Sequence, residues 1–334
     1  DIHKVAQRIS QILSAPYAVN GHEITLTASI GLVIPETYYQ NPEDIIRDAD
    51  IAMYRAKQLG GAQVVLFAPE MYTQILARVE MENDLRKALE HGEFEVFYQP
   101  IYALTDNRIT GFEALVRWNH PQKGLIMPSE FIQSAEEIGV IIPLGYYVLE
   151  EACRKMQFWR ERYQAGRGLM VSVNFSARQI LHEGLVENIR AILDRTGFDP
   201  KMLWLEVTES TLLARNPRVF THLNELRAMG IRIEIDDFGT GYSAFSYLHT
   251  LPVDGFKIDR SFVSDIQQGG QQIIKSLLEM GQHLGLTQVA EGVETEQQRE
   301  YLKCLACSYA QGYLMSRPIQ AGAVEELLKG LEEQ

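Results

Sequence analysis

Carboxylates gather where strand-like segments end. Residues 231–243 read IRIEIDDFGTGYS, in which isoleucines alternate with polar residues before Asp236 and Asp237 arrive together. Alternating β-branched residues are typical of a strand. Two adjacent carboxylates repel each other and lose solvation if buried, unless a cation lies between them or one is protonated. The pair therefore indicates a cation or acid–base site, although an acidic turn that caps a helix would contain the same residues.

Other strand-like segments also end in polar side chains. Glu113 and Arg117 lie in EALVR, and Asn174 lies in SVNFS. A single strand-end glutamate is more often a helix cap or an ion-pair partner, so the recurrence is what indicates a site. The full set comprises Glu113, Arg117, Asn174, Glu206, Glu209, Asp236, Asp237, Lys257, Asp259, Glu291, Glu294 and Gln311.

The chemistry of this set predicts a site for divalent cations. So many carboxylates around one mouth are hard to hold together without added positive charge. Oxygen donors suit Mg²⁺ or Mn²⁺. Two ions about 3.5–4 Å apart, sharing Asp236, would suit in-line attack on a phosphodiester. Lys257 could hold the attacking water or stabilise phosphoryl charge, and a lysine that only neutralises its acidic neighbours fits the same position.

The elements that must position these side chains alternate between strand and helix patterns from residue 93 onward. Eight strands with crossover helices predict an α/β fold, a TIM-type (β/α)8 barrel with its active site at the C-terminal strand ends. Residues 105–108 are too few for a parallel crossover, so the first strand should run antiparallel to the second. The predicted strands span residues 94–104, 109–118, 169–176, 203–209, 231–238, 255–259, 287–293 and 310–316.

The first 68 residues form a smaller α/β unit. Its predicted elements are a helix over residues 2–13, a strand over 24–33, a helix from Asn41 and Pro42 to Leu59, and a strand over 63–67. Apolar residues at helical spacing then predict a connecting helix over residues 69–91. We therefore divide the chain at residues 1–68, 69–92 and 93–334. Its abrupt start inside a helix pattern suggests a fragment.

Composition narrows the class of protein. The chain has 334 residues and a formal net charge of −13, which argues against binding of a DNA or RNA polymer through a basic face. Three cysteines provide no disulfide framework and suit a reducing compartment, so we expect a cytoplasmic location. No apolar run approaches the roughly 18 residues of a membrane span. We expect no membrane contact of this segment, although a longer protein could be anchored upstream.

Two groups of motifs resemble known families. ASIGLV, ADIAMYRAK and VVLF resemble the last third of a GGDEF (diguanylate cyclase) domain, without the GGDEF motif or the nucleotide-binding part. This remnant is therefore expected to be structural and not to make cyclic di-GMP. The remaining motifs resemble the EAL family of cyclic di-GMP-specific phosphodiesterases, from roughly residue 80 to residue 330. They are EALVRWNHP, VNFS, LEVTES, DDFGTGYS, LPVDGFKID, AEGVET and QGYLMSRP.

The resemblance to the EAL family implies a role for each matching residue. The implied ligands of one metal ion are Glu113, Asn174, Glu206 and Asp236, and the implied surroundings of a second are Asp236, Asp237 and Glu291. The implied catalytic residues are Lys257, Glu291 and Glu113. The implied contacts of the dinucleotide are Gln99, Leu115, Arg117 and Gln311, with Arg117 on a phosphate. Glu209 and Glu294 would anchor the DFGTGYS loop, which in the family couples metal binding to dimerisation, so a homodimer is expected.

Two stretches depart from the family pattern. Residues 243–245 read S-A-F in place of S-S-L, and residues 306–308 read A-C-S in place of a sequence like G-C-D. Ser308 therefore replaces an acid, which is expected to weaken a secondary contact near the second metal. No predicted primary ligand is lost.

Three interpretations follow from these residues. The leading one is metal-dependent hydrolysis of cyclic di-GMP, a second messenger, to linear pGpG. The alternative is a non-catalytic cyclic di-GMP receptor, although the EAL glutamate, the aspartate pair and the lysine that such receptors usually lose are all present. A third is another Mg²⁺-dependent barrel enzyme, such as a proton-abstracting lyase with Lys257 as its base.

Overall fold

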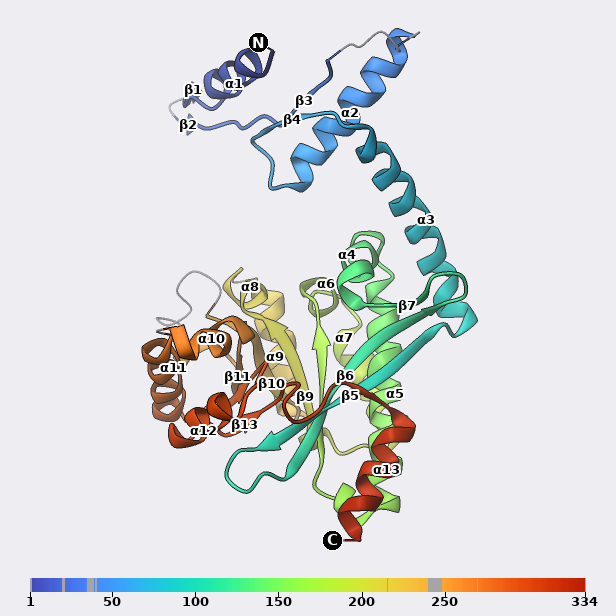
Figure 1. Cartoon of the computed structure of the whole chain (residues 1–334), viewed down its shortest axis with the longest axis vertical. Coiled ribbons are helices and arrows are strands. Elements are labelled where there is room, and N and C mark those ends of the chain that lie inside the picture. The colour runs from blue at the N-terminus through green and yellow to red at the C-terminus, as the bar shows by residue number, and fades with distance from the viewer. Residues whose placement is uncertain are drawn as a thin grey trace. The chain divides into compact units, whose positions relative to one another are not determined.

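The computed structural model of the chain (Figure 1) describes residues 2–19, 22–34, 39, 41–214, 216–239, 248–268 and 270–333. The chain folds as two units, Asp1–Asp84 and Leu85–Gln334, each packed mainly against itself. Within the described ranges, the helices lack the combination of length and apolar composition that a membrane span requires.

Eight strands of the second unit close into a barrel. In order around the ring they are β5 (Phe94–Ala103), β6 (Ile109–His120), β8 (Met170–Phe175), β9 (Leu203–Thr208), β10 (Arg232–Phe238), β11 (Gly255–Ile258), β12 (Thr287–Ala290) and β13 (Tyr309–Ala310). Neighbours from β6 to β13 pair in parallel. β5 runs antiparallel to both β6 and β13, because the chain reverses within a short turn at Asn107, whose φ is 62°. The predicted barrel and its antiparallel first strand are confirmed.

Helices follow most strands and surround the barrel (Figure 1). They are α4 (Pro128–Ile138), α5 (Ile141–Arg162), α6 (Ala177–Ile180), α7 (Leu185–Thr196), α8 (Glu209–Leu213), α9 (Pro217–Ala228), α10 (Arg260–Ser264), α11 (Gln271–Leu284), α12 (Glu296–Cys304) and α13 (Ala321–Glu332). Two short strands that the sequence patterns did not indicate extend the sheet. β7 (Gly124–Ile126) pairs with β6, and β14 (Ile319–Gln320) pairs with β5.

The eighth strand is shorter than predicted. A strand over residues 310–316 is wrong, because β13 ends at Ala310 and the chain then makes a turn. The turn is held by hydrogen bonds from the Leu314 N–H to the Val293 carbonyl and from the Met315 N–H to the Gly312 carbonyl. Glycine is required at position 312, since a Cβ there would lie 2.2 Å from the Val293 oxygen. Gln311 lies just before this turn, where its N–H donates to the Ala290 carbonyl and its carbonyl accepts from the Val293 N–H.

The first unit contains two small sheets and two helices before the connecting helix. Its elements are α1 (Ile2–Leu13), β1 (Tyr17–Val19), β2 (His22–Ile24), β3 (Ile30–Leu32), α2 (Pro42–Gln58), β4 (Val64–Leu66) and α3 (Pro69–His91). The strand predicted over residues 24–33 is in fact two strands, of which β3 pairs in parallel with β4. Asn41 precedes α2 as predicted, but its side chain makes no capping hydrogen bond. The helix predicted over residues 69–91 is present as α3.

Apolar side chains fill one end of the barrel and leave the other end polar. Ile101, Met170, Trp204 and Val289 form a buried cluster among strand residues. The carboxyl ends of the parallel strands carry the polar side chains instead. The core therefore closes the barrel beneath the site and holds the strand ends at fixed spacing.

Candidate active site

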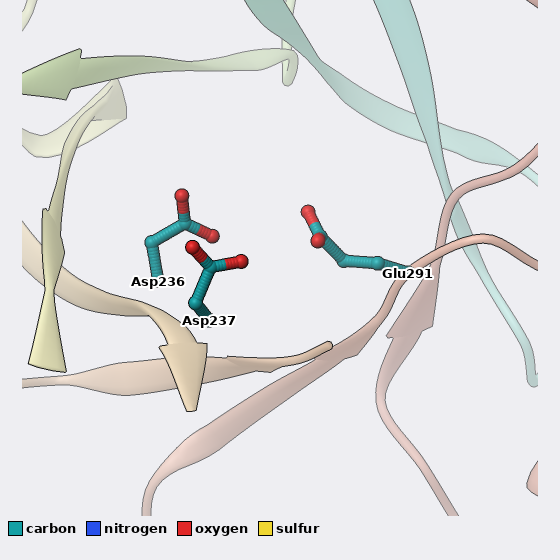
Figure 2. A group of neighbouring side chains, drawn as sticks. All are labelled: Asp236, Asp237 and Glu291. Atoms are coloured by element: carbon teal, nitrogen blue, oxygen red, sulfur yellow. The ribbon is translucent and has the colours of Figure 1, made fainter. Parts of the chain in front are cut away.

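A bulge in β10 brings the two adjacent aspartates to the same side. Neighbouring residues of a regular strand point to opposite faces. Here the register of β10 with β11 shifts between Ile235 and Phe238, and Asp237 has a left-handed φ of 54°. Aspartate tolerates this conformation better than most residues. One oxygen each from Asp236, Asp237 and Glu291 then lie within 4.8 Å of one another, and Figure 2 shows the aspartates projecting toward Glu291.

Lys257 lies at the centre of the acidic residues. Its side chain is only 1% exposed and extends from β11 into the barrel mouth. Four carboxylates surround its Nζ, at 2.6 Å for Glu291, 2.8 Å for Glu206, 3.2 Å for Glu113 and 3.6 Å for Asp236. These residues come from β6, β9, β10 and the end of β12, so the closed barrel alone brings them together.

Two amide side chains hold Glu113 and Glu291 in place. The Nε2 of Gln311 donates to Glu113 Oε2 at 2.7 Å and to Glu291 Oε1 at 2.9 Å. The Nδ2 of Asn174, at the end of β8, donates to Glu113 Oε1 at 2.8 Å. Both oxygens of Glu113 therefore accept a hydrogen bond from an amide, and Gln311 links Glu113 to Glu291.

The pKa values of this group depend on burial and on the lysine charge. Burial by itself would lower the pKa of Lys257, but Asp236, Glu113, Glu206 and Glu291 hold it well above its usual value. Burial would raise the pKa of Glu113, yet the Lys257 charge and the amide hydrogen bonds lower it overall. Lys257 is therefore protonated and Glu113 ionised at neutral pH.

Other carboxyls of the group resist ionisation. Burial, followed by the negative charge of Glu113, raises the pKa of Glu206 well above its usual range. Burial raises the pKa of Glu291 to about 7, although Lys257 opposes the shift. Burial and the Asp236 charge raise the pKa of Asp237. One lysine therefore does not compensate all of these acids, and the ring favours additional positive charge.

Glu234 belongs to the same acidic group, although it was not among the predicted site residues. It lies on β10, two residues before Asp236, and is 1% exposed. Burial raises its pKa to about 8, and the charges of Asp236, Glu291 and Glu113 add to this effect while Lys257 opposes it. A charged residue that alternates with isoleucines was the available signal, because it shares the inward face of Asp236.

The residues present fit divalent cations. Glu206 Oε1 and Asp236 Oδ1 are buried and accept no hydrogen bond from the described part of the chain. Asp236, Asp237 and Glu291 form the one group of three such residues close enough to hold an ion among the described residues. All of these donors are oxygens, which Mg²⁺ and Mn²⁺ prefer.

Three of the four predicted substrate-binding residues line one cavity, and Arg117 does not. Gln99, Leu115, Gln311 and Glu294 line a cavity of about 190 Å³, together with Glu113 and Glu291. Arg260 and Tyr313 line it too, and these residues were not predicted for the site. The buried Arg117 instead donates from Nη1 to the Val116 carbonyl at 2.8 Å, with its guanidinium 5.5 Å from the centre of the Phe97 ring.

Glu209 lies where an anchor of the loop after β10 was predicted. Its Oε2 accepts a hydrogen bond from the Gly239 N–H at 3.0 Å, at the point where that loop begins. Residues 240–247 lie outside the described residues, and so do the predicted dimer contact and the departures at Ala244 and Phe245. Asp259 caps α10 through the Ser261 N–H, which accounts for its position at a strand end.

The eight-stranded barrel and the lysine-centred acidic mouth define an α/β barrel protein whose strand ends carry oxygen donors that could hold metal ions. Residues 82–318 match the EAL domain family, and residues 1–63 match the diguanylate cyclase, GGDEF domain family. The chain therefore belongs to the EAL domain family and carries a short GGDEF region at its N-terminus.

Relatives with assigned activities are similar along almost the whole chain. The bifunctional diguanylate cyclase/cyclic di-GMP phosphodiesterase MucR of Pseudomonas aeruginosa is 39% identical over 98% of this chain and 47% of its own length. The cyclic di-GMP phosphodiesterase PdeR of Escherichia coli is 34% identical over 98% of this chain and 49% of its own length. The chain thus spans about half the length of these relatives.

Solved structures agree with the fold. The MucR phosphodiesterase in complex with cyclic di-GMP is 42% identical, with a TM-score of 0.70, over 73% of this chain and 99% of that chain. The EAL enzyme Bd1971, in its form bound to cAMP and cyclic di-GMP, is 31% identical, with a TM-score of 0.73, over 87% of this chain and 77% of that chain.

Proposed function

We propose that this chain hydrolyses cyclic di-GMP to linear pGpG with the help of two divalent cations. The observation that carries the proposal is the convergence of Glu113, Glu206, Asp236 and Glu291 on Lys257 at one barrel mouth. Similarity to a phosphodiesterase solved with cyclic di-GMP supports the choice of substrate. A ring of oxygen donors with one lysine would also suit a lyase, but the named relatives favour phosphodiester hydrolysis.

The proposed metal ligands follow the pattern of the EAL family. The first ion would be held by Glu113, Asn174, Glu206 and Asp236, and the second by Asp236, Asp237 and Glu291. Glu206 Oε1 and Asp236 Oδ1 support this assignment, because both atoms are buried and accept no hydrogen bond within the described part of the chain. Bound ions would supply positive charge for the phosphoryl oxygens and would lower the pKa of a water molecule. Mg²⁺ and Mn²⁺ are both compatible with the ligand set.

The protein residues then orient and compensate the reacting groups. Lys257 provides a fixed positive charge at the centre of the mouth, where negative charge grows on the phosphoryl oxygens. Burial raises the pKa of Glu291 to about 7 in the absence of an ion, and a bound cation would favour the ionised carboxylate as its ligand. Gln311 keeps Glu291 and Glu113 at a fixed separation through its two hydrogen bonds.

Two cavities offer room for the dinucleotide. Leu115 lines both the cavity of about 190 Å³ over the acids and a mostly apolar cavity of about 290 Å³ that reaches α4 and α5. We propose that Gln99, Leu115 and Gln311 contact the substrate, with Glu294 on the same wall. Arg117 uses Nη1 to donate to the Val116 carbonyl, and its other N–H groups could pair with a phosphate.

The wider assignment follows the family. We propose that residues 1–68 are a structural GGDEF remnant, that 69–92 connect it, and that 93–334 form the phosphodiesterase. We also propose a homodimer through the DFGTGYS loop, in which Glu209 anchors the first residues, and a cytoplasmic location.

One incubation separates hydrolysis from binding alone. The purified chain is mixed with cyclic di-GMP and Mg²⁺ or Mn²⁺, with and without EDTA, and products are separated by chromatography. Metal-dependent pGpG supports the proposal, whereas tight binding without product in either metal indicates a receptor. The double substitution Glu113→Ala and Lys257→Ala should abolish turnover, with exposed Lys275→Ala as control. Hydrolysis that survives the double substitution would contradict the site assignment.

A further inference from the structure

A second cavity opens at the end of the barrel opposite to the acidic site. It has a volume of about 810 Å³ and is lined by Met170, Trp204, Arg232 and Tyr309. These residues stand at or near the amino-terminal starts of β8, β9, β10 and β13, whereas the proposed metal ligands stand at or beyond the carboxyl ends of the barrel strands. The buried cluster of Met170, Trp204 and their neighbours separates the two ends. The cavity is therefore distinct from the candidate active site.

Positive charge gathers around this cavity in a chain of net charge −13. Arg108, Lys201 and Arg232 line it, and Asp106 is the one acidic residue in the lining. Arg108 Nε donates to Asp106 Oδ2 at 2.7 Å, so these two charges compensate each other. No described carboxylate lies within ion-pair distance of Lys201 or Arg232, and both residues are exposed. The cavity thus presents two uncompensated cations.

Aromatic and apolar surfaces line the rest of the cavity. The Arg232 guanidinium carbon lies over the Trp204 ring, 5.2 Å from its centre, a distance typical of a cation–π contact. Tyr102 and Tyr309 are partly buried in the same lining, and Leu327 and Leu331 of α13 contribute an apolar wall. Inorganic phosphate would use the cations but leave these surfaces uncovered.

We propose that this cavity is a binding site for a nucleoside phosphate. The phosphate would pair with Lys201 and Arg232, because ammonium and guanidinium groups are the usual protein partners of phosphate oxygens. The base would lie against the tyrosines and leucines of the lining. The cavity volume falls within the range of roughly 300–1,000 Å³ that small-molecule sites occupy.

Calorimetric titration of the full chain with AMP, GMP, CMP and UMP tests the proposal. EDTA is included so that divalent cations do not recruit the nucleotides to the acidic mouth. We expect at least one nucleotide to bind with a Kd below about 1 mM. Lys201→Gln and Arg232→Gln should each weaken that binding about tenfold, which is the effect of losing one charge-assisted phosphate contact. Inorganic phosphate should bind more weakly than the nucleotide.

Matched variants decide whether the site is the one proposed. Lys303→Gln, which removes an exposed lysine from α12, and Arg117→Ala, near the candidate active site, should leave nucleotide affinity unchanged. Absence of binding by all four nucleotides would overturn the proposal. So would binding that survives Lys201→Gln and Arg232→Gln, binding lost in Arg117→Ala, or inorganic phosphate that binds as tightly. Both glutamine variants should still hydrolyse cyclic di-GMP at the parent rate, which separates this proposal from the proposed activity.

Discussion

Replacing Lys257 with methionine should lower the free energy of unfolding of the barrel. Methionine retains much of the side-chain volume, so the main change is the loss of one buried charge. Two of the surrounding oxygens, on Glu291 and Glu206, lie 2.6 and 2.8 Å from Nζ. Breaking a buried ion pair by removing one partner typically costs about 3–5 kcal/mol, because the other charge is left uncompensated. We expect a loss of that size in the free energy of unfolding at pH 8 without metal.

The pH dependence of this loss has a definite sign. Without the lysine, the pKa values of the buried carboxyls rise further, so the folded variant binds more protons than its unfolded chain. Its stability should therefore fall as pH increases from about 5 to 8. At pH 5, where these carboxyls can be neutral, the cost should shrink to about 1 kcal/mol. Added Mg²⁺ should restore part of the stability at pH 8, since a bound cation would replace the missing charge.

Urea denaturation followed by tryptophan fluorescence measures this effect in the barrel. The three tryptophans, Trp118, Trp159 and Trp204, are all buried in the second unit, so the signal does not report on the first. Lys275→Met is a suitable control, because that side chain is 51% exposed and its contact with Glu279 is 3.8 Å. If Lys257→Met were as stable as the parent at pH 8 in EDTA, the lysine would not be compensating the acidic ring, and our reasoning would be refuted.

Three further substitutions test individual parts of the site. Glu234→Gln should raise the free energy of unfolding by roughly 2–5 kcal/mol at pH 9 and by little at pH 4. The reason is that the parent carboxyl has a folded pKa of about 8, so its ionisation destabilises the folded barrel as pH rises. Equal urea midpoints at pH 9 would contradict this. Gln311→Leu removes two hydrogen bonds to carboxylates, which should raise the pKa of Glu113. The acidic limb of the hydrolysis pH profile should therefore move to higher pH, and the rate should fall about tenfold. An unchanged profile would show that these hydrogen bonds do not lower the pKa of Glu113. Gly312→Ala forces a Cβ against the Val293 oxygen and should cost about 2–4 kcal/mol in urea denaturation, whereas full stability would show that the turn adapts.

Much of the barrel could be predicted from the sequence because its signals are local. Alternating apolar residues indicate strands, and a four-residue connection cannot join parallel neighbours, so the reversed first strand followed directly. The eighth strand was predicted too long, because its apolar residues continue past Ala310 while the close approach of Gly312 to Val293 ends the pairing. That approach depends on two segments which only the closed barrel brings together.

The sequence by itself determined the chemistry available to this protein: oxygen donors and one lysine at successive strand ends, which meet because parallel strands share one face of a barrel. Tertiary structure decided how those groups act. The left-handed Asp237 directs two neighbouring aspartates into one mouth, which strand alternation alone would not predict. Burial raises the pKa of Glu234 to about 8, and the charges of Asp236, Glu291 and Glu113 add to this effect. The physical reason is that side-chain identity follows from the chain, whereas distance, desolvation and the sum of neighbouring charges exist only in the folded barrel.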